Sequence, residues 1–253
     1  MLNSLFDVQG RTAIVTGASS GLGRTFARGL HAAGANVVVV GRRQSLIDAL
    51  AGDLGEGAVG VVADVATTSG REQILEAALD RWSTVSILVN NAGTTVDTRP
   101  DARDEDLDEF ARVIQVNLTG LFGLTQLVGR HMASNGGGSI VNIGSIYGIV
   151  ASTGGASYVA SKGAVHSLTK ELAVQWGGVG IRVNAIAPGW FPSDMTKHVF
   201  DTPGGQRMLE RQVPLGRGGR EDELLGALLF LCSDASSYCT GHLLVVDGGY
   251  TAR

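Results

Sequence analysis

Short apolar segments alternate with longer amphipathic segments along almost the whole chain. Residues 36–40 read NVVVV, and such a run of β-branched residues is typical of a strand that is buried on both faces of a sheet. Glycines border several of these runs, as Gly10 and Gly17 border the first. The pattern predicts seven strands, at Thr12–Thr16, Asn36–Val40, Ala58–Ala63, Ser86–Asn90, Ser139–Ile143, Ile181–Ile186 and His242–Val246.

The segments between these strands carry apolar residues at the spacing of a helix. Leu22, Phe26 and Leu30 follow this spacing, for example, and the segment closes at Gly34. The longest helix is expected to bend, because Asn117 and Gly120 interrupt it. The pattern predicts helices at Leu22–Ala33, Ser45–Leu54, Gly70–Trp82, Asp104–Met132, Tyr158–Trp176 and Glu221–Cys232.

The regular alternation of strands and helices predicts the fold class. It is typical of βαβ units, and therefore of an α/β, doubly wound (Rossmann) fold with a seven-stranded parallel sheet and helices on both faces. No linker, low-complexity tract or internal repeat interrupts the pattern. We therefore expect residues 1–253 to form a single domain, and a chain of this length buries roughly 70% of its surface.

Composition and charge exclude several classes of partner. The net charge is −4 and no basic block occurs, which argues against nucleic acid as a partner. No apolar run reaches the ~18 residues that would span a bilayer, so we expect no membrane partner. Charged residues make up only 17% of the chain, below the usual ~25%, which favours an oligomer with extra buried surface.

The cysteines and histidines bear on compartment and metal binding. Two cysteines, Cys232 and Cys239, are too few for a disulfide framework or a four-ligand zinc site, and we interpret them as inert thiols in a reducing cytoplasm. Residues 1–11 lack the basic and apolar regions of a signal peptide. The five histidines form no ligand pattern, so no metal is expected.

A glycine-rich loop joins the first predicted strand to the first predicted helix. Its spacing, Gly17-x-x-x-Gly21-x-Gly23, differs from both G-x-G-x-x-G and the phosphate loop of nucleotide triphosphatases. Glycines allow the backbone to approach a ligand, and the free N–H groups of a helix N-terminus suit a pyrophosphate. A glycine-rich turn without a ligand is the simpler alternative, but the position in the first βαβ unit favours a dinucleotide site.

Further motifs follow in a fixed order along the chain. Asn90-Asn91-Ala92-Gly93 follows the fourth predicted strand, and Tyr158-x-x-x-Lys162 opens a predicted helix. Together with the TGxxxGxG loop, these motifs resemble those of the short-chain dehydrogenase/reductase family, in its single-domain branch. The resemblance runs from about Val8 to Gly249 and includes gluconate 5-dehydrogenases and 3-oxoacyl-carrier-protein reductases. Supporting positions are Asp64-Val65, Asn117, Ser145 and Pro188-Gly189.

Tyr158 and Lys162 can share a proton-transfer task. They are four residues apart, so a helix places them on one face. A phenol has a pKa near ~10, and lowering it by ~3 units requires roughly 4 kcal/mol in favour of the phenolate, which a nearby ammonium helps to supply. The resemblance implies that Tyr158 is the general acid/base, that Ser145 holds the substrate oxygen, and that the Asn117 carbonyl holds a water bonded to Lys162.

The resemblance also implies a nicotinamide dinucleotide cofactor. We expect NADP, because the second strand ends at Gly41, where NAD-preferring relatives usually carry an aspartate, and Arg42 and Arg43 can bind a 2′-phosphate. The absence of a basic residue at Ser20 keeps NAD possible. The implied cofactor-binding residues are Gly17, Ser19, Ser20, Gly21, Leu22, Gly23, Gly41, Arg42, Arg43, Asp64, Val65, Asn91, Ala92, Gly93, Tyr158, Lys162, Pro188, Gly189 and Thr196.

The implied reaction is hydride transfer between a secondary alcohol or ketone and the nicotinamide ring. A sugar acid and a 3-oxoacyl thioester both remain possible substrates, beneath a lid at about 190–215 that carries apolar residues and the cations Lys197, His198, Arg207 and Arg211. A catalytically silent NADP-binding sensor or scaffold is the alternative. The resemblance further implies a homotetramer.

Overall fold

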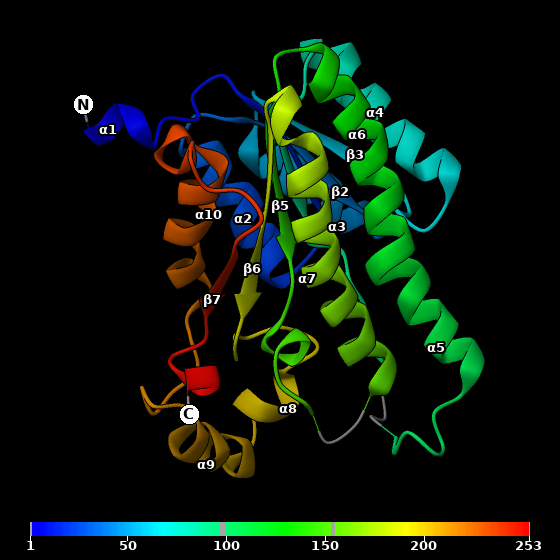
Figure 1. Ribbon diagram of the computed structural model, residues 1–253, viewed down its shortest axis with the longest axis vertical. Helices are drawn as coiled ribbons and strands as arrows, with labels where there is room; N and C mark the ends of the chain where they lie inside the picture. Colours follow the sequence, from blue (N-terminus) through cyan, green and yellow to red (C-terminus); the bar gives the residue numbers. More distant parts are fainter. Residues whose placement is uncertain (1, 97–99, 153–154, 253) are drawn as a thin grey trace.

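The structure is a computed structural model that describes residues 2–96, 100–152 and 155–252. Its centre is one seven-stranded sheet in the order β3-β2-β1-β4-β5-β6-β7, and all neighbouring strands are parallel (Figure 1). The strands are β1 (Thr12–Thr16), β2 (Asn36–Gly41), β3 (Ala58–Val62), β4 (Ile87–Asn90), β5 (Gly138–Ile143), β6 (Ile181–Pro188) and β7 (Leu243–Val246). The predicted fold class is confirmed, and each predicted strand is present with its ends shifted by at most two residues.

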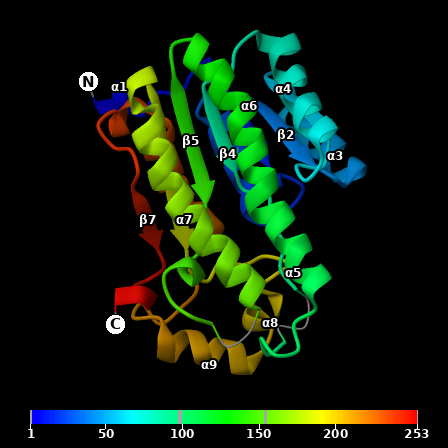
Figure 2. The same cartoon turned by 45° about the vertical axis from the view of Figure 1, so that its right-hand side comes forward.

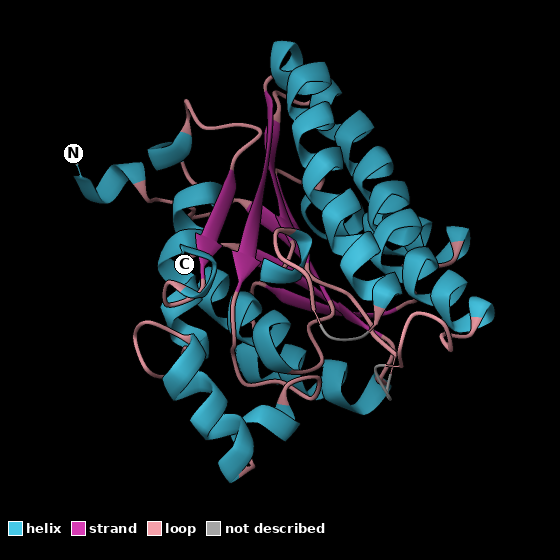
Figure 3. Ribbon diagram, turned by 60° about the horizontal axis from the view of Figure 1, so that its bottom comes forward, coloured by secondary structure: helices cyan, strands magenta, loops and turns pink. Residues whose placement is uncertain are grey.

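Helices cover both faces of this sheet, as Figures 2 and 3 show. Phe26, Leu30 and Leu228 pack against one face, and Ile74 and Leu124 pack against the other. Full burial of each large apolar side chain contributes about 1.5–3 kcal/mol. The first layer contains α2 (Gly21–Ala32), α3 (Gln44–Leu54) and α10 (Leu225–Cys232); the second contains α4 (Thr68–Trp82), α5 (Leu107–Ile114), α6 (Leu121–Ser134) and α7 (Ala156–Trp176). No helix in the described ranges is long and apolar enough to cross a membrane.

The long helix predicted from Asp104 begins three residues later and is interrupted by a π-helical segment. Its first turn starts at Leu107, because the Asp106 carboxylate accepts hydrogen bonds from the N–H groups of Asp108 and Glu109 at 2.9 and 3.0 Å. A π-helical segment, Gln115–Gly120, then separates α5 from α6 and contains the interrupting residues. The predicted start at Asp104 was wrong, because the helix begins at Leu107. The helix predicted at Glu221–Cys232 likewise begins with a 3₁₀ turn, Glu221–Leu224.

Helix α7 begins at Ala156, two residues before its predicted start. Gly155 precedes it with a φ of +79°, and a side chain from a distant segment takes the place of a local cap. The Glu105 carboxylate accepts from the N–H groups of Ala156 and Ser157 at 2.8 and 3.1 Å, and also from the Ser157 hydroxyl. A long-range contact therefore fixes the end of α7 that carries Tyr158.

The carboxyl ends of the strands meet at one edge of the sheet, at the bottom of Figure 1. After β3 the chain crosses to the other side of β1, so the strand order reverses between β1 and β4. Ligands of doubly wound folds bind at such a reversal. The segment after β6 covers this edge with two short helices, α8 (Lys197–Phe200) and α9 (Pro203–Gln212).

Candidate active site

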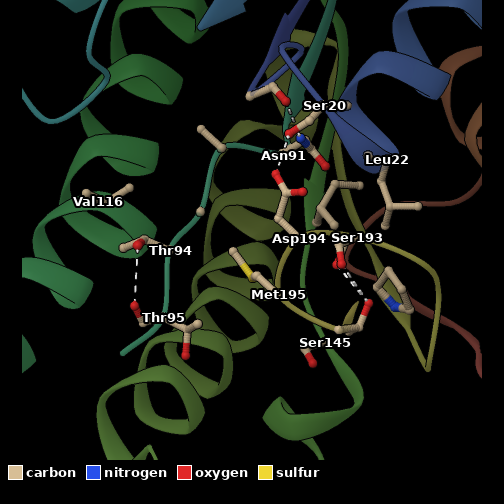
Figure 4. Close-up of a pocket in the computed structure, with 18 of the residues that line it drawn as sticks. Ser20, Leu22, Asn91, Thr94, Thr95, Val116, Ser145, Ser193, Asp194 and Met195 are labelled. Carbon is tan, nitrogen blue, oxygen red and sulfur yellow. Dashed lines mark hydrogen bonds between the residues drawn. The ribbon is translucent and has the colours of Figure 1, made fainter. Parts of the chain in front are cut away.

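A cavity of about 550 Å³ opens at the carboxyl edge of the sheet, and Figure 4 shows part of its lining. All nineteen residues that the sequence predicted for the cofactor line it, and so does Ser145. Asn117 does not line the cavity but lies directly behind its wall. Its Oδ1 would be only 3.4 Å from a Cβ placed on Gly93, which is a lining residue. The structure therefore brings the predicted motifs together around one cavity, with Asn117 supporting its wall.

The glycine loop is shaped by close packing against the end of β4. Gly17 has a φ of +68°, and a Cβ there would lie 2.8 Å from the Asn91 Nδ2. A Cβ at Gly23 would lie 2.3 Å from the Gly17 carbonyl oxygen, so both positions require glycine. The Ser20 side chain does not cap α2, and the N-terminus of α2 borders the cavity. Its N–H groups and positive dipole fit a pyrophosphate.

Arg42 and Arg43 lie where β2 ends, at the adenosine side of the predicted site. Arg42 is exposed, with its Nη1 3.8 Å from the Asp64 Oδ2. Arg43 folds back onto the glycine loop and donates to the Ser19 and Ser20 hydroxyls at 2.9 and 2.6 Å. Although the loop itself has no basic residue, Arg43 therefore supplies it with a guanidinium from the neighbouring turn.

Lys162 is buried at the opposite end of the cavity. Its side chain reaches the end of β5, where Nζ donates to the Ile143 carbonyl at 2.7 Å, and only 5% of the residue is exposed. Nζ lies 5.7 Å from the centre of the Tyr158 ring. Burial disfavours the ammonium and lowers the pKa of Lys162 from 10.5 to about 8. A buried cation, still mostly protonated at neutral pH, thus lies close to the face of a phenol ring.

Ser145 and Asn117 fix the wall around these two residues. Ser145 follows β5, and its Oγ accepts from the Tyr147 N–H at 3.1 Å. The Asn117 amide accepts from the Thr94 N–H at 2.7 Å, and its Nδ2 donates to the Thr94 carbonyl at 2.9 Å and to the Ser161 Oγ at 3.0 Å. Its side chain thus ties the loop after β4 to α7. The water implied on its backbone carbonyl stays a prediction.

Several residues of the cavity carried no signal in the sequence. Figure 4 shows Thr94 and Thr95 on one side and Ser193 and Asp194 on another. These residues lie in irregular loops, and the spacing of apolar residues in the sequence does not predict the path of a loop. Conversely, none of the four lid cations named from the sequence lines the cavity. Trp190, Phe191 and Met195 line the cavity from the segment 190–215, in which the sequence indicated apolar cover for a substrate. The further residues of the lining that no motif indicated are Val40, Ala63, Val116, Ile143, Gly144, Ile146, Tyr147 and Ser152.

Known proteins share this arrangement along the whole chain. The family model described as Enoyl-(Acyl carrier protein) reductase matches residues 17–251. The galactitol 2-dehydrogenase (L-tagatose-forming) of Cereibacter sphaeroides is 40% identical over 251 residues, which cover 98% of each chain. The gluconate 5-dehydrogenase of Gluconobacter oxydans is 40% identical over 256 residues, which cover 98% of this chain and 97% of that protein.

The same likeness holds in three dimensions. The crystal structure of a gluconate 5-dehydrogenase from Burkholderia cenocepacia, in complex with NADP and tartrate, has a TM-score of 0.94 and is 37% identical. The match covers 100% of both chains. The resemblance inferred from the motifs is thereby confirmed. The chain belongs to the short-chain dehydrogenase/reductase family and is an oxidoreductase of that family, acting on CH–OH groups.

Proposed function

We propose that the protein transfers hydride reversibly between NADP and a secondary alcohol or ketone, with Tyr158 as the general acid/base. The observation that carries this proposal is the buried Lys162 ammonium beneath the Tyr158 ring, in the same cavity as Ser145. When bound, a nicotinamide ring supplies the hydride donor or acceptor. The glycine loop fits such a dinucleotide, because its backbone and the α2 N-terminus face the cavity.

Each side chain has a defined task in this proposal. The Tyr158 hydroxyl gives its proton to the carbonyl oxygen of the substrate, and in the reverse direction the Tyr158 phenolate takes the proton from the alcohol. Ser145 donates a hydrogen bond to the same oxygen and orients it. Lys162 stabilises the phenolate by its charge. Asn117 positions the loop wall and α7 through the contacts described above.

We further propose that residues 1–253 act as one catalytic domain whose segment 190–215 forms a substrate lid. Trp190, Phe191 and Met195 line the cavity from this segment. Val199 is buried instead in a small core that α8 and α9 form with Trp190. The lid therefore has its own packing, and it contributes the apolar side of the substrate space.

A polyhydroxylated substrate, a sugar alcohol or sugar acid, fits the remaining wall. Thr94, Thr95 and Ser152, which all carry hydroxyls, line the cavity together with Ser145 and Tyr158. Such a wall offers hydrogen-bonding partners to several hydroxyls of one ligand. The names of the galactitol and gluconate dehydrogenases support the same class.

The two arginines at the end of β2 support NADP as the preferred cofactor. A guanidinium binds a phosphate with parallel, charge-assisted hydrogen bonds. The structure adds a steric reason for the glycine that precedes them: a Cβ at Gly41 would lie 3.0 Å from the Ile47 Cδ1 and 3.3 Å from the Ser19 Cβ. An aspartate at this position would require small shifts of both neighbours, which favours the glycine that is present.

We infer a homotetramer as the working assembly. Two large apolar side chains project from the α5 and α7 layer, because Leu107 and Val174 are 80% and 84% exposed. Strand β7 lies at one edge of the sheet and leaves Val245 partly exposed. Pairing of the α5–α7 layer about one two-fold axis and of β7 about another would cover these surfaces.

The cytoplasm is the proposed location, on the evidence of the thiols. Cys232 and Cys239 are both free. Burial raises the pKa of Cys232 to about 12, which makes it inert. Free thiols persist in a reducing compartment.

The first prediction concerns Tyr158. Tyr158→Phe removes one hydroxyl, and we expect kcat to fall more than tenfold, because general acid–base catalysis contributes about 10²- to 10⁴-fold. The NADP Kd should stay within about twofold of the wild-type value. The assay follows reduced-nicotinamide absorbance with galactitol, gluconate and a 3-oxoacyl thioester as probes. Tyr238→Phe, at a fully exposed position, is the control. NADP binding without turnover of any probe, or an active Tyr158→Phe, would contradict the proposal.

The second prediction follows from the depressed pKa of Lys162. Between about pH 8 and 10.5 the unfolded chain keeps the Lys162 proton and the folded chain releases it, so this residue makes stability rise with pH in that window. Lys162→Met removes the contribution. The unfolding free energy of the wild type minus that of Lys162→Met should increase from pH 8 to 10.5, measured by urea denaturation without cofactor. A constant difference would contradict a buried ammonium.

The third prediction concerns the two arginines at the end of β2. Arg42→Ala and Arg43→Ala should each lower kcat/KM for NADPH by about 10- to 150-fold, the equivalent of a charge-assisted contact of ~1.5–3 kcal/mol, and change kcat/KM for NADH much less. Arg81→Ala, on the exposed side of α4, serves as the control. A wild type that prefers NADH would overturn the assignment.

The fourth prediction concerns assembly. Light scattering at micromolar protein should give the mass of four 26.2 kDa chains. Val174→Asp places a charge on the exposed face of α7, and it should lower that mass by at least half without lowering the helix content. A 26.2 kDa species for the wild type is the result that would refute the tetramer.

A further inference from the structure

We infer that His166 is a positioning residue that holds Ser145 in place from behind the cavity wall. The inference rests on the proposed role of Ser145 in orienting the substrate oxygen. His166 follows Lys162 by four residues on α7, and only 7% of it is exposed. It does not line the cavity and therefore touches neither substrate nor cofactor.

The imidazole bonds both ends of the turn that carries Ser145. The Ser145 N–H donates to the His166 Nε2 at 3.4 Å, and the backbone of Gly148 forms a hydrogen bond with the ring as well. Burial lowers the pKa of His166 and favours the neutral ring. A neutral imidazole has one donor and one acceptor, which match one carbonyl and one N–H of the turn.

Two glycines leave the space that the ring fills. A Cβ at Gly144 would lie 2.2 Å from the His166 Nε2, and a Cβ at Gly148 would lie 2.3 Å from its Cε1. Any larger residue at either position would displace the imidazole. The two glycines therefore allow the ring to approach the backbone of the turn closely enough for the hydrogen bonds described above.

The turn is anchored on its other side by the sheet. The Gly144 N–H donates to the Ile186 carbonyl at 2.7 Å, and the Ser145 Oγ accepts from the Tyr147 N–H at 3.1 Å. The sheet thus fixes where the turn begins. His166 supplies the second anchor, which fixes how the turn continues past Ser145. An apolar residue at 166 would fill the volume but leave the Ser145 N–H without its acceptor.

His131 offers a matched control on the neighbouring helix. Its Nε2 accepts from the Val85 N–H at 3.2 Å, two residues before β4, and it does not line the cavity. Loss of this contact resembles loss of the His166 contact in kind, but it occurs far from Ser145 in the fold. His131→Leu should therefore leave kcat within about twofold of the wild-type value.

A double-mutant cycle tests whether His166 acts through Ser145. The variants are His166→Leu, Ser145→Ala and their combination, assayed with NADP and the faster of galactitol and gluconate. We expect His166→Leu to lower kcat at least fivefold with an unchanged NADP Kd, and the double variant to match Ser145→Ala within twofold. His166→Gln, which keeps a donor and an acceptor, should recover most of kcat. Multiplicative losses in the double variant would overturn the inference.

A second measurement needs no turnover and separates this inference from the proposed function. Amide hydrogen exchange should be faster at Ser145 in His166→Leu and unchanged there in His131→Leu. Unchanged exchange at Ser145 in His166→Leu would overturn the positioning role. An active Ser145→Ala, or no turnover with either probe, would instead refute the proposed function, while the exchange result still decides whether His166 holds the turn.

Discussion

A cation held out of water at the end of β5 is the constraint on which the rest of the site depends. Moving an ammonium into a protein interior costs several kcal/mol unless polar groups surround it. Lys162 has the Ile143 carbonyl at 2.7 Å and the face of the Tyr158 ring at 5.7 Å. A Cβ at Gly93 would come within 3.7 Å of its Nζ. The ends of β4 and β5 and the first turns of α7 must therefore meet at this point, and they define the cavity between them.

Polar contacts from distant segments fix how α7 is rotated about its axis and where it lies along that axis. Glu105 binds its first N–H groups, and Asn117 binds Ser161 one turn later. Further along, the Thr169 hydroxyl accepts from the Asn142 Nδ2 of β5 at 3.0 Å. All these contacts are directional, whereas apolar packing alone tolerates small rotations of a helix. The geometry between Tyr158 and Lys162 is thus determined by residues that never reach the ligand space.

The sequence predicts this fold well where the determinants are local. The runs of apolar residues and the glycines that border them located every strand. Motifs beside the strand ends indicated most of the cavity, because parallel strands bring their carboxyl ends to one edge of the sheet. Helix starts were less predictable, since Glu105 acts on Ala156 from 51 positions away. His166 also escaped detection: one histidine on a helix carries no signal until the fold places Gly144 and Gly148 beside it.

The balance of charge at the cavity mouth connects the cofactor loop with the lid. The Arg43 Nη1 lies 3.9 Å from the Asp194 Oδ2, and the Ser20 hydroxyl lies 3.4 Å from the same oxygen. Both ionic side chains are at least half exposed, so their attraction amounts to about 0–1 kcal/mol. In the proposed NADP complex a phosphate, which carries more charge than this carboxylate, would compete for the same guanidinium, which already donates to the Ser19 and Ser20 hydroxyls. A contact this weak would offer little resistance to the phosphate of the proposed cofactor.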